Sequence, residues 1–176
     1  MMRTVIVYES MFGNTRAIAE AIGEGVAEHS DVTVLNLDDI TEGALADVDL
    51  VVAGGPTHTF GMSRPQTRLD AANRQPYLVT QRVSLRDWLP TLADREAVVD
   101  VAVFCTKAAA PRWLPGSAAH SAARALKHRH IGLAAKPVVF HVEGMQGPLV
   151  PGELDRARDW GAELAHATKD LKRRRR

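Results

Sequence analysis

Short apolar runs alternate with longer amphipathic stretches from one end of the chain to the other. The runs that we predict to be β-strands are rich in Val, Leu and Ala: Arg3–Tyr8, Val32–Leu37, Val48–Ala53, Val98–Phe104 and Pro137–Val142. The third and fourth runs are almost continuously apolar, which is typical of strands covered on both faces. Strands that alternate with helices in this way indicate an α/β protein with a parallel sheet.

Apolar residues between these runs recur at helical spacing. Ile18, Ala21, Ile22, Gly25 and Val26 form one such stripe between the first two strands. The same criterion predicts further helices: Arg64–Asn73, Arg82–Leu92, Ser117–Ile131 and Gly152–Lys169. In the predicted helix Ser117–Ile131, Ser117 is the expected N-cap, and Gly132 is the expected stop. The remainder of residues 54–81 is predicted to be a long loop.

Composition narrows the class of protein. The 176 residues, 45% of them hydrophobic, fit one globular domain that needs no disulfide. A lone cysteine and scattered histidines give no metal-binding spacing, and no Gly-x-Ser-x-Gly motif indicates a hydrolase. No apolar stretch approaches the roughly 18 residues that would span a bilayer, so we expect a cytoplasmic protein without a membrane span.

Charge is distributed unevenly along the chain. Residues 1–50 contain 2 basic and 10 acidic residues, whereas residues 51–136 contain 12 basic and 5 acidic residues. The last eight residues, 169–176, contain 6 basic residues and 1 acidic residue. We predict a folded domain over residues 1–168 and a frayed basic tail over 169–176, because like charges repel. Binding of nucleic acid or of an acidic partner by this tail is the less favoured alternative.

The segment with the clearest chemistry is Tyr8-Glu9-Ser10-Met11-Phe12-Gly13-Asn14-Thr15, which lies between the first strand and the first helix. A turn at this place presents backbone N–H groups and the positive end of a helix dipole to an anion. The segment has neither the lysine of a Walker P-loop nor a Gly-x-Gly-x-x-Gly fingerprint. A monophosphate held by neutral donors therefore fits best.

This segment also resembles the N-terminal signature of the flavodoxin family. Eight positions match it: Ile6, Val7, Tyr8, Ser10, Gly13, Thr15, Ala19 and Ile22. The resemblance implies a three-layer α/β/α sandwich with a five-stranded parallel sheet of order 2-1-3-4-5, and FMN as the cofactor. It also implies that the FMN phosphate is held by Ser10, Met11, Phe12, Gly13, Asn14 and Thr15. An ordinary capped helix after a strand is the alternative.

If the fold is flavodoxin-like, two more loops reach the same ligand, because ligands of doubly wound sheets lie outside the carboxyl ends of the strands. After the third strand come Pro56, Thr57, His58, Thr59, Phe60 and Gly61. His58 or Phe60 would cover a face of the flavin ring, and Gly61 lies where a peptide flips toward flavin N5. The alternative is a plain turn with a packed phenylalanine.

The loop after the fourth strand contributes Thr106, Lys107 and Trp113, and the indole of Trp113 is the expected second stacking group. A place for Trp113 in a lid or the core is the alternative. We interpret Cys105 as a small buried hydrophobe, since it has no resolving partner.

Two departures from the family stand out. Arg64, Arg68, Lys107 and Arg112 lie in or beside the proposed flavin loops, where acidic residues are usual. Around the flavin they would favour its anionic reduced form and attract an anionic partner, whereas in the alternative they are solvated or pair with carboxylates. The chain also follows the short-chain plan, and its extra length lies between Gly61 and Arg95.

These observations favour an FMN-binding flavodoxin-like protein that transfers electrons to or from a redox partner. An NAD(P)H-dependent quinone reductase or a protoporphyrinogen-oxidase-like flavoenzyme, in which a homodimer would build the site, is one alternative, and a module without redox chemistry is another. We assign no catalytic acid or base and no metal ligand, because the flavin carries the chemistry in such proteins.

Overall fold

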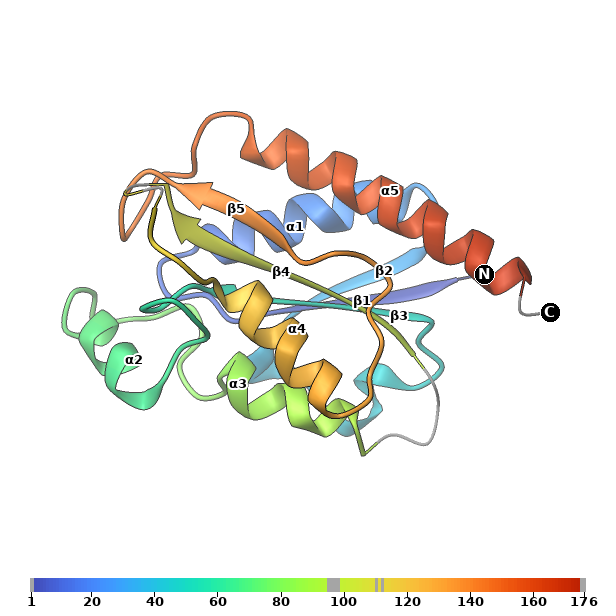
Figure 1. The fold of residues 1–176 in the computed structure, drawn as a ribbon, viewed down its shortest axis with the longest axis horizontal. Coiled ribbons are helices and arrows are strands. Elements are labelled where there is room, and N and C mark those ends of the chain that lie inside the picture. Colours follow the sequence, from blue (N-terminus) through green and yellow to red (C-terminus); the bar gives the residue numbers. More distant parts are fainter. Residues whose placement is uncertain (1, 95–98, 110, 112, 175–176) are drawn as a thin grey trace.

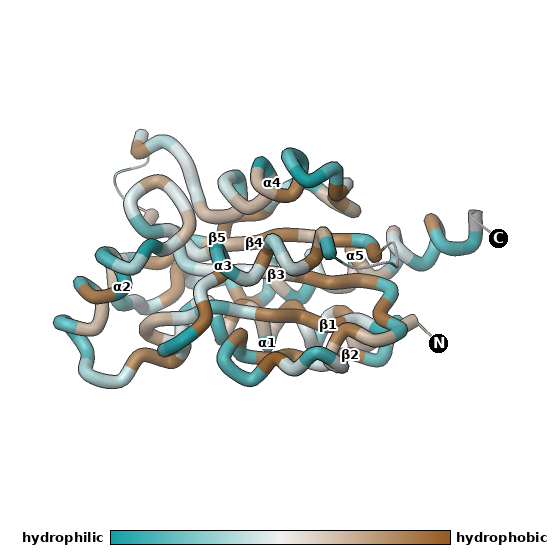
Figure 2. Tube along the Cα trace, turned by 90° about the horizontal axis from the view of Figure 1, so that it is seen from below, coloured by the Kyte–Doolittle hydropathy of each residue, from teal (hydrophilic) through white to brown (hydrophobic). Residues whose placement is uncertain are grey.

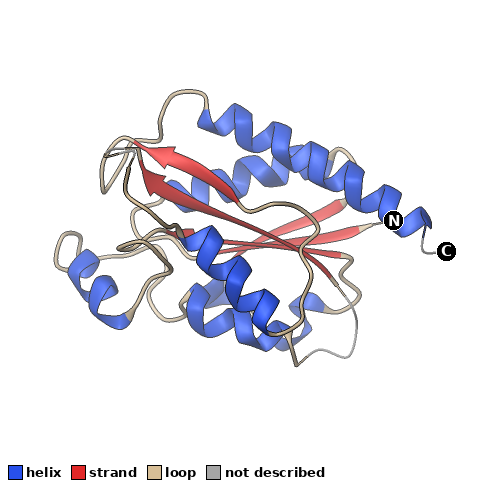
Figure 3. Cartoon of the chain, in the orientation of Figure 1, coloured by secondary structure: helices blue, strands red, loops and turns tan. Residues whose placement is uncertain are grey.

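The computed structural model describes residues 2–94, 99–109, 111 and 113–174, and it has a five-stranded parallel sheet with helices on both faces (Figures 1 and 3). The strand order is β2-β1-β3-β4-β5, which confirms the predicted topology. The strands are β1 (Arg3–Tyr8), β2 (Asp31–Asn36), β3 (Leu50–Pro56), β4 (Asp100–Ala108) and β5 (Val138–Val142).

The central strands are apolar on both faces because both faces are covered. Val5, Val51 and Val103 point to one core, whereas Ile6 and Val52 point to the other. These residues are at most 4% exposed, and the hydropathy colouring of Figure 2 shows β1 and β3 as mainly hydrophobic runs. Side chains that alternate along a strand thus build two cores from one continuous apolar run.

Helices α1 (Asn14–Ala27) and α5 (Glu153–Arg174) cover one face of the sheet (Figure 1). They pack so closely that a Cβ on Gly25 would lie 2.0 Å from the carbonyl oxygen of Arg158. A Cβ on Gly161 would likewise lie 2.3 Å from the carbonyl oxygen of Ile22. Glycine is therefore required at both positions of the predicted apolar stripes.

The opposite face is covered by α3 (Leu85–Trp88), the 3-10 helix η3 (Leu89–Leu92) and α4 (Ala118–His128). Short 3-10 helices η1 (Leu37–Asp39) and η2 (Glu42–Leu45) follow β2. Helix α2 (Pro65–Ala72) lies beyond the carboxyl ends of the strands (Figure 1). None of the helices in the described ranges is long and apolar enough to cross a membrane.

Strand β3 ends at Pro56, three residues past its predicted end, and four other elements also differ from the predictions by more than one residue. The predicted helix over 82–92 is split, because Ser84 caps α3 by accepting from the Asp87 N–H, and Pro90 lies in the first turn of the 3-10 helix that follows. Helix α4 begins after the Ser117 cap, as predicted, but ends at His128 instead of Ile131. His130 has a φ of 59°, so the chain turns before Gly132.

The other two differences are in β4 and α5. Strand β4 continues to Ala108, four residues past the predicted end, while its predicted first residue, Val98, lies outside the described residues. Helix α5 continues to Arg174 and so crosses the expected boundary at residue 168, where fraying was predicted. The Lys172 ammonium pairs with the Asp49 carboxylate, which links this end of α5 to the start of β3.

The long segment before β4 is fixed against the rest of the fold. The Asp38 carboxylate accepts the backbone N–H groups of residues 81, 82 and 83. Burial raises the pKa of Asp38, but the three donors outweigh burial and hold that pKa below its ordinary value. The buried Thr80 hydroxyl accepts from the Ser10 N–H and donates to the Asn36 side chain. The segment is thereby tied directly to the predicted phosphate loop.

Candidate functional site

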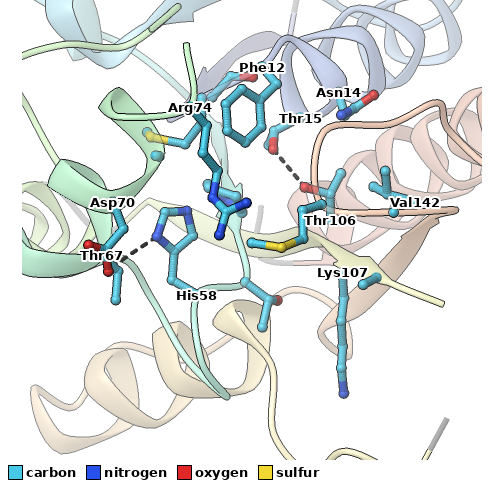
Figure 4. A pocket seen from close by; sticks show the side chains of 18 of the residues that line it. Phe12, Asn14, Thr15, His58, Thr67, Asp70, Arg74, Thr106, Lys107 and Val142 are labelled. Carbon is cyan, nitrogen blue, oxygen red and sulfur yellow. Dashed lines mark hydrogen bonds between the residues drawn. The ribbon is translucent and has the colours of Figure 1, made fainter. Parts of the chain in front are cut away.

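A pocket of about 230 Å³ lies outside the carboxyl ends of the strands, where α2 faces the start of α1 (Figure 4). Most of the predicted site residues line it: Ser10, Met11, Phe12, Asn14, Thr15, Pro56, Thr57, His58, Thr59, Thr106 and Lys107. They come from the loop after β1 and the start of α1, from the end of β3 and the turn after it, and from the end of β4. The chain order reverses between β1 and β3, so the pocket lies at the switch point of the sheet.

The loop after β1 ends at the uncapped start of α1. Gly13 occupies the N-cap position with a φ of 99°, and no side chain caps the helix. The Ser10 hydroxyl accepts the Gly13 N–H at 3.1 Å, which closes the loop. The first N–H groups of a helix have no acceptor within the helix. Here those of Asn14 and Thr15 open at the pocket edge, and an anion is the natural acceptor for them.

Two hydroxyl groups meet beside these N–H groups. The Thr15 and Thr106 oxygens are 2.7 Å apart and both residues are buried, as the dashed line in Figure 4 shows. Each hydroxyl has one hydrogen, and only one of the two hydrogens is needed for their mutual bond. The other hydrogen remains for a ligand oxygen. The start of α1 and the end of β4 thus converge on one point of the pocket.

The buried carboxylate of Glu9, the residue before Ser10, connects this loop to distant parts of the chain. Glu9 is 0% exposed, and its Oε1 accepts from the Ser63 hydroxyl at 2.5 Å and from the Arg68 guanidinium at 2.8 Å. Its Oε2 accepts the Leu85 N–H at 2.8 Å. Burial raises the pKa of Glu9, and these donors oppose that rise. The sequence interpretation assigned no role to Glu9, because its partners are 54 to 76 residues away.

His58 lies in the pocket, next to Arg74 and Asp70 in Figure 4. Its Nδ1 is 2.9 Å from the hydroxyl oxygen of Thr67 on α2. Burial, with a smaller effect of the nearby Arg68 charge, lowers the pKa of His58 to about 4. The imidazole is therefore neutral at pH 7. Because the Thr67 hydroxyl donates to the Arg64 carbonyl, Nδ1–H donates to Thr67 and Nε2 is left as an acceptor.

The turn from His58 to Gly61 places its two central side chains differently. Backbone hydrogen bonds join His58 and Gly61 in both directions, at 2.8 and 3.2 Å. Thr59 lines the pocket, whereas Phe60 is 49% exposed and does not. Gly61 is also absent from the pocket lining, and a flip of its peptide would break the bond that its carbonyl accepts. The structure therefore brings His58, but not Phe60, to the pocket.

Two predicted side chains, one at the end of β4 and one in the loop after it, are directed away from the pocket. The Lys107 ammonium donates to the carbonyl oxygens of Leu114 and Gly116, and Figure 4 shows this side chain pointing out of the pocket. Trp113 is 79% exposed and does not line the pocket. Cys105 is buried, as predicted, and burial raises the pKa of its thiol.

The basic residues expected around the flavin have separate environments. Arg68 forms an ion pair with Glu9, as in the alternative that these cations pair with carboxylates. Arg64 is exposed and does not line the pocket. Arg112 lies outside the described residues. The cation that lines the pocket beside Lys107 is instead Arg74, and Figure 4 shows its guanidinium above His58.

Two walls of the pocket were missed by the sequence interpretation. Helix α2 and the turn after it contribute Thr67, Asp70, Ala71 and Arg74. Their i, i+3, i+4, i+7 spacing places them on one helix face, but that spacing does not say that the face lines a pocket. The segment after β5 contributes Val142, Gly144 and Met145. It is held to the phosphate loop because the Asn14 amide donates to the Gln146 carbonyl at 3.0 Å.

Comparison with known proteins agrees with this geometry. The flavodoxin family model matches residues 6–85, which include the phosphate loop, β3 and α2. In sequence, residues 6–85 are thus similar to the flavodoxin family. No curated protein is significantly similar to the chain in sequence.

Solved flavodoxin structures share the fold along almost the whole chain. A flavodoxin from the domain Archaea superposes with a TM-score of 0.63 at 23% identity, over 96% of this chain and 99% of that one. A WrbA-like flavodoxin from Agrobacterium tumefaciens has a TM-score of 0.63 at 22% identity, over 97% and 99%. The two-electron reduced flavodoxin of Megasphaera elsdenii has a TM-score of 0.62 at 18% identity, over 93% and 98%. The flavodoxin-like fold is therefore confirmed.

Proposed function

We propose that the pocket binds FMN, with its phosphate at the start of α1, and that the protein transfers electrons through the flavin to or from a redox partner. The observation that supports this most directly is the convergence of the uncapped helix start and the Thr15–Thr106 hydroxyl pair in one pocket. Neutral hydroxyl and N–H donors suit a monophosphate, and they need no metal or lysine.

The residues of the pocket fit this group in both charge and position. Ser10 and Thr15 are buried and fixed, so they bind a ligand without losing side-chain freedom on binding. Asn14 is fixed by Gln146, which keeps the segment after β5 close to the phosphate loop. FMN, when bound, supplies one-electron and two-electron redox chemistry. The protein supplies the binding, the orientation and the access.

A flavoenzyme, either an NAD(P)H-dependent quinone reductase or a protoporphyrinogen-oxidase-like protein, is the second candidate function. The observation that favours it is His58, because a neutral imidazole that lines the pocket can hydrogen-bond a reacting group through Nε2. Two-electron reactions of organic substrates move protons with electrons, whereas a one-electron carrier has no need for such a group. Arg74, the pocket cation nearest His58 in Figure 4, would favour an anionic substrate.

Absorption spectroscopy tests the proposal and separates the two candidates. The purified protein is titrated with FMN, and the complex is then reduced stepwise without oxygen. We expect saturable binding and, for an electron carrier, a one-electron reduced flavin that accumulates during the titration. Direct two-electron bleaching by NAD(P)H, with repeated turnover of a quinone, would support the flavoenzyme. No spectral change with excess FMN would overturn both.

A further inference from the structure

A second groove lies beside the proposed FMN pocket, between the His58–Gly61 turn and α4. It shares Thr59 with that pocket, so the two openings adjoin. Its lining residues include four arginines and one histidine but no carboxylate: Thr59, Phe60, Gly61, Met62, Arg64, Arg86, Ser121, Arg124, Ala125, His128 and Arg129. This is a strongly cationic surface at the mouth of the site.

The arginines of this groove have no acidic partner in the part of the chain that the structure describes. Among the described residues, no ion pair includes Arg64, Arg86, Arg124 or Arg129. Arg86 is held by the carbonyl oxygens of Met62 and Ser63. The sequence explains this pattern, because residues 101–142 contain six Lys and Arg and no Asp or Glu. On the other face of the sheet, in contrast, Arg16 and Arg158 each pair with a glutamate.

The turn at the edge of the groove holds an aromatic side chain outward. Thr59 and Phe60 have φ values of 42° and 71°, which is the left-handed region that favours glycine or asparagine. Gly116 lies directly over this turn, where a Cβ would be 2.4 Å from the Phe60 carbonyl oxygen. Strained residues persist where the surrounding structure holds them, and they concentrate at functional sites. The turn thus places a half-exposed phenyl ring in the same groove as four arginines that form no ion pair with a described residue.

We propose that this groove docks an acidic surface of a partner protein, with Phe60 as the apolar contact and Arg64, Arg124 and Arg129 as the surrounding cations. An aromatic anchor surrounded by charged groups is the usual make-up of a protein interface, and the charges accelerate and orient the encounter. The further role of this groove, as the surface through which the pocket exchanges electrons, rests on the proposed function. Docking itself requires only the described surface.

A free dinucleotide phosphate is the other anionic occupant to consider. Small ligands are recognised by polar groups that converge inside a closed pocket. Arg64, Arg124 and Arg129 are instead exposed, and they come from opposite sides of an open groove, one before α2 and two from α4 and its C-cap. Charges spread in this way suit the broad surface of a protein better than a single phosphate group.

Two variants of equal charge test the proposal. Arg64→Glu/Arg124→Glu reverses two charges in the groove, whereas Lys169→Glu/Arg173→Glu reverses two exposed charges on α5, across the sheet. The probe is the anionic haem protein cytochrome b5, with cationic cytochrome c as its counterpart. Binding is measured at low ionic strength by NMR shifts of the flavin-free chain, labelled with 15N, so the readout does not depend on FMN.

For the wild-type chain we expect saturable binding of cytochrome b5, with shifts concentrated at residues 59–64 and 121–129. The groove variant should weaken this binding at least about tenfold, the α5 variant less than about twofold, and added salt should weaken the wild-type complex strongly. Phe60→Ala should weaken binding several-fold with little change in salt dependence. Cytochrome c should bind more weakly than cytochrome b5.

Three outcomes would overturn the proposal. One is the absence of saturable binding of cytochrome b5 by the wild-type chain at low salt. Another is an equal loss of binding in both charge variants, which would mean that only net charge matters. The third comes from the same titration with NADPH as the probe. If the groove variant loses NADPH binding but keeps cytochrome b5 binding, the groove belongs to the dinucleotide. Failure of the proposed function would instead appear as the absence of FMN binding, with docking unaffected.

Discussion

The two sides of the pocket differ in how firmly they are held. On one side, the loop from Ser10 to Thr15 rests on the buried Glu9 network, and its left-handed position is filled by Gly13. On the other side, the His58–Gly61 turn puts Thr59 and Phe60 in left-handed conformations and leaves Phe60 half exposed. The first side has the low-strain, closed structure that suits a fixed cofactor. The second has the strained, open structure that suits a changing contact.

Burial also determines how much an ion pair contributes to stability. The Glu9–Arg68 pair and the Arg16–Glu20 pair have the same N–O distance, 2.8 Å. The Glu9 side chain is 1% exposed, whereas that of Glu20 is 50% exposed. A buried charge that loses its partner has neither the partner nor water to stabilise it, whereas an exposed charge is stabilised by water. Equal contacts should therefore contribute very unequally to stability.

The largest effect is expected from Glu9→Ala. The change leaves Arg68, Ser63 and the Leu85 N–H without their acceptor, and it should lower the free energy of unfolding by about 3–5 kcal/mol. Glu20→Ala, which breaks the exposed pair, should lower it by at most about 0.5 kcal/mol. Chemical denaturation of the flavin-free proteins measures both. Similar losses in the two variants would contradict the account of the firm side.

His58 should make stability depend on pH. Its folded pKa of about 4 lies below the ordinary 6.5, so its contribution is complete above pH 6.5 and is lost as pH falls toward 4. At pH 5 the free energy of unfolding should have fallen by about 2 kcal/mol on this account. His58→Asn removes that component, while every other group still titrates. Denaturation of both proteins at pH 7 and pH 5 measures how much of the fall in the free energy of unfolding is due to His58. Equal falls in the wild-type protein and the variant would contradict the lowered pKa of His58.

The strained turn offers a gain in stability. Thr59→Asn/Phe60→Gly places residues that tolerate a positive φ at both central positions, and it should raise the free energy of unfolding by about 1 kcal/mol. Gly13→Ala is the matched opposite on the firm side. Gly13 has a φ of 99°, and no atom lies near an added Cβ. The substitution should therefore lower the free energy of unfolding by about 1 kcal/mol through backbone strain alone. If the turn variant is less stable, packing of the phenyl ring outweighs the strain.

The smallest effect is expected from Trp113→Ala. The residue is 79% exposed, so the change should alter the free energy of unfolding by less than about 0.5 kcal/mol. Trp88→Ala is the control, because Trp88 is 6% exposed and its loss should lower stability by about 3–5 kcal/mol. Thermal unfolding measures both. A loss above about 1 kcal/mol for Trp113→Ala would place this indole in the packed structure after all.

The sequence predicted the parts of the molecule that depend on local pattern. The parallel α/β class follows from alternating apolar runs, whereas the strand order, the three-layer sandwich and the loop at Ser10 follow from the resemblance that a signature within 17 residues carries. The FMN contacts assigned to Phe60 and Trp113 stay predictions, and the structure places both side chains outside the pocket. Loop side chains of this kind are oriented by backbone conformation and exposure, and neither leaves a periodic signal in the sequence.

The parts that were missed depend on distant contacts. The role of Glu9 requires Ser63, Arg68 and Leu85, and each of these is more than 50 residues away. The pocket wall of α2 depends on where that helix lies relative to the phosphate loop, and helical spacing alone does not specify this. Buried polar networks and walls built from insertions are therefore the features that needed the structure.

The central claim is that the Ser10–Thr15 loop binds the phosphate of FMN, and comparison of FMN with riboflavin tests it most directly. Riboflavin lacks the phosphate but has the same ring, so fluorescence quenching can follow both. We predict that FMN binds at least about 100-fold more tightly, and that Ser10→Ala weakens FMN about tenfold while leaving riboflavin unchanged. Equal affinities for the two flavins, or equal losses in the variant, would contradict the assignment of this loop.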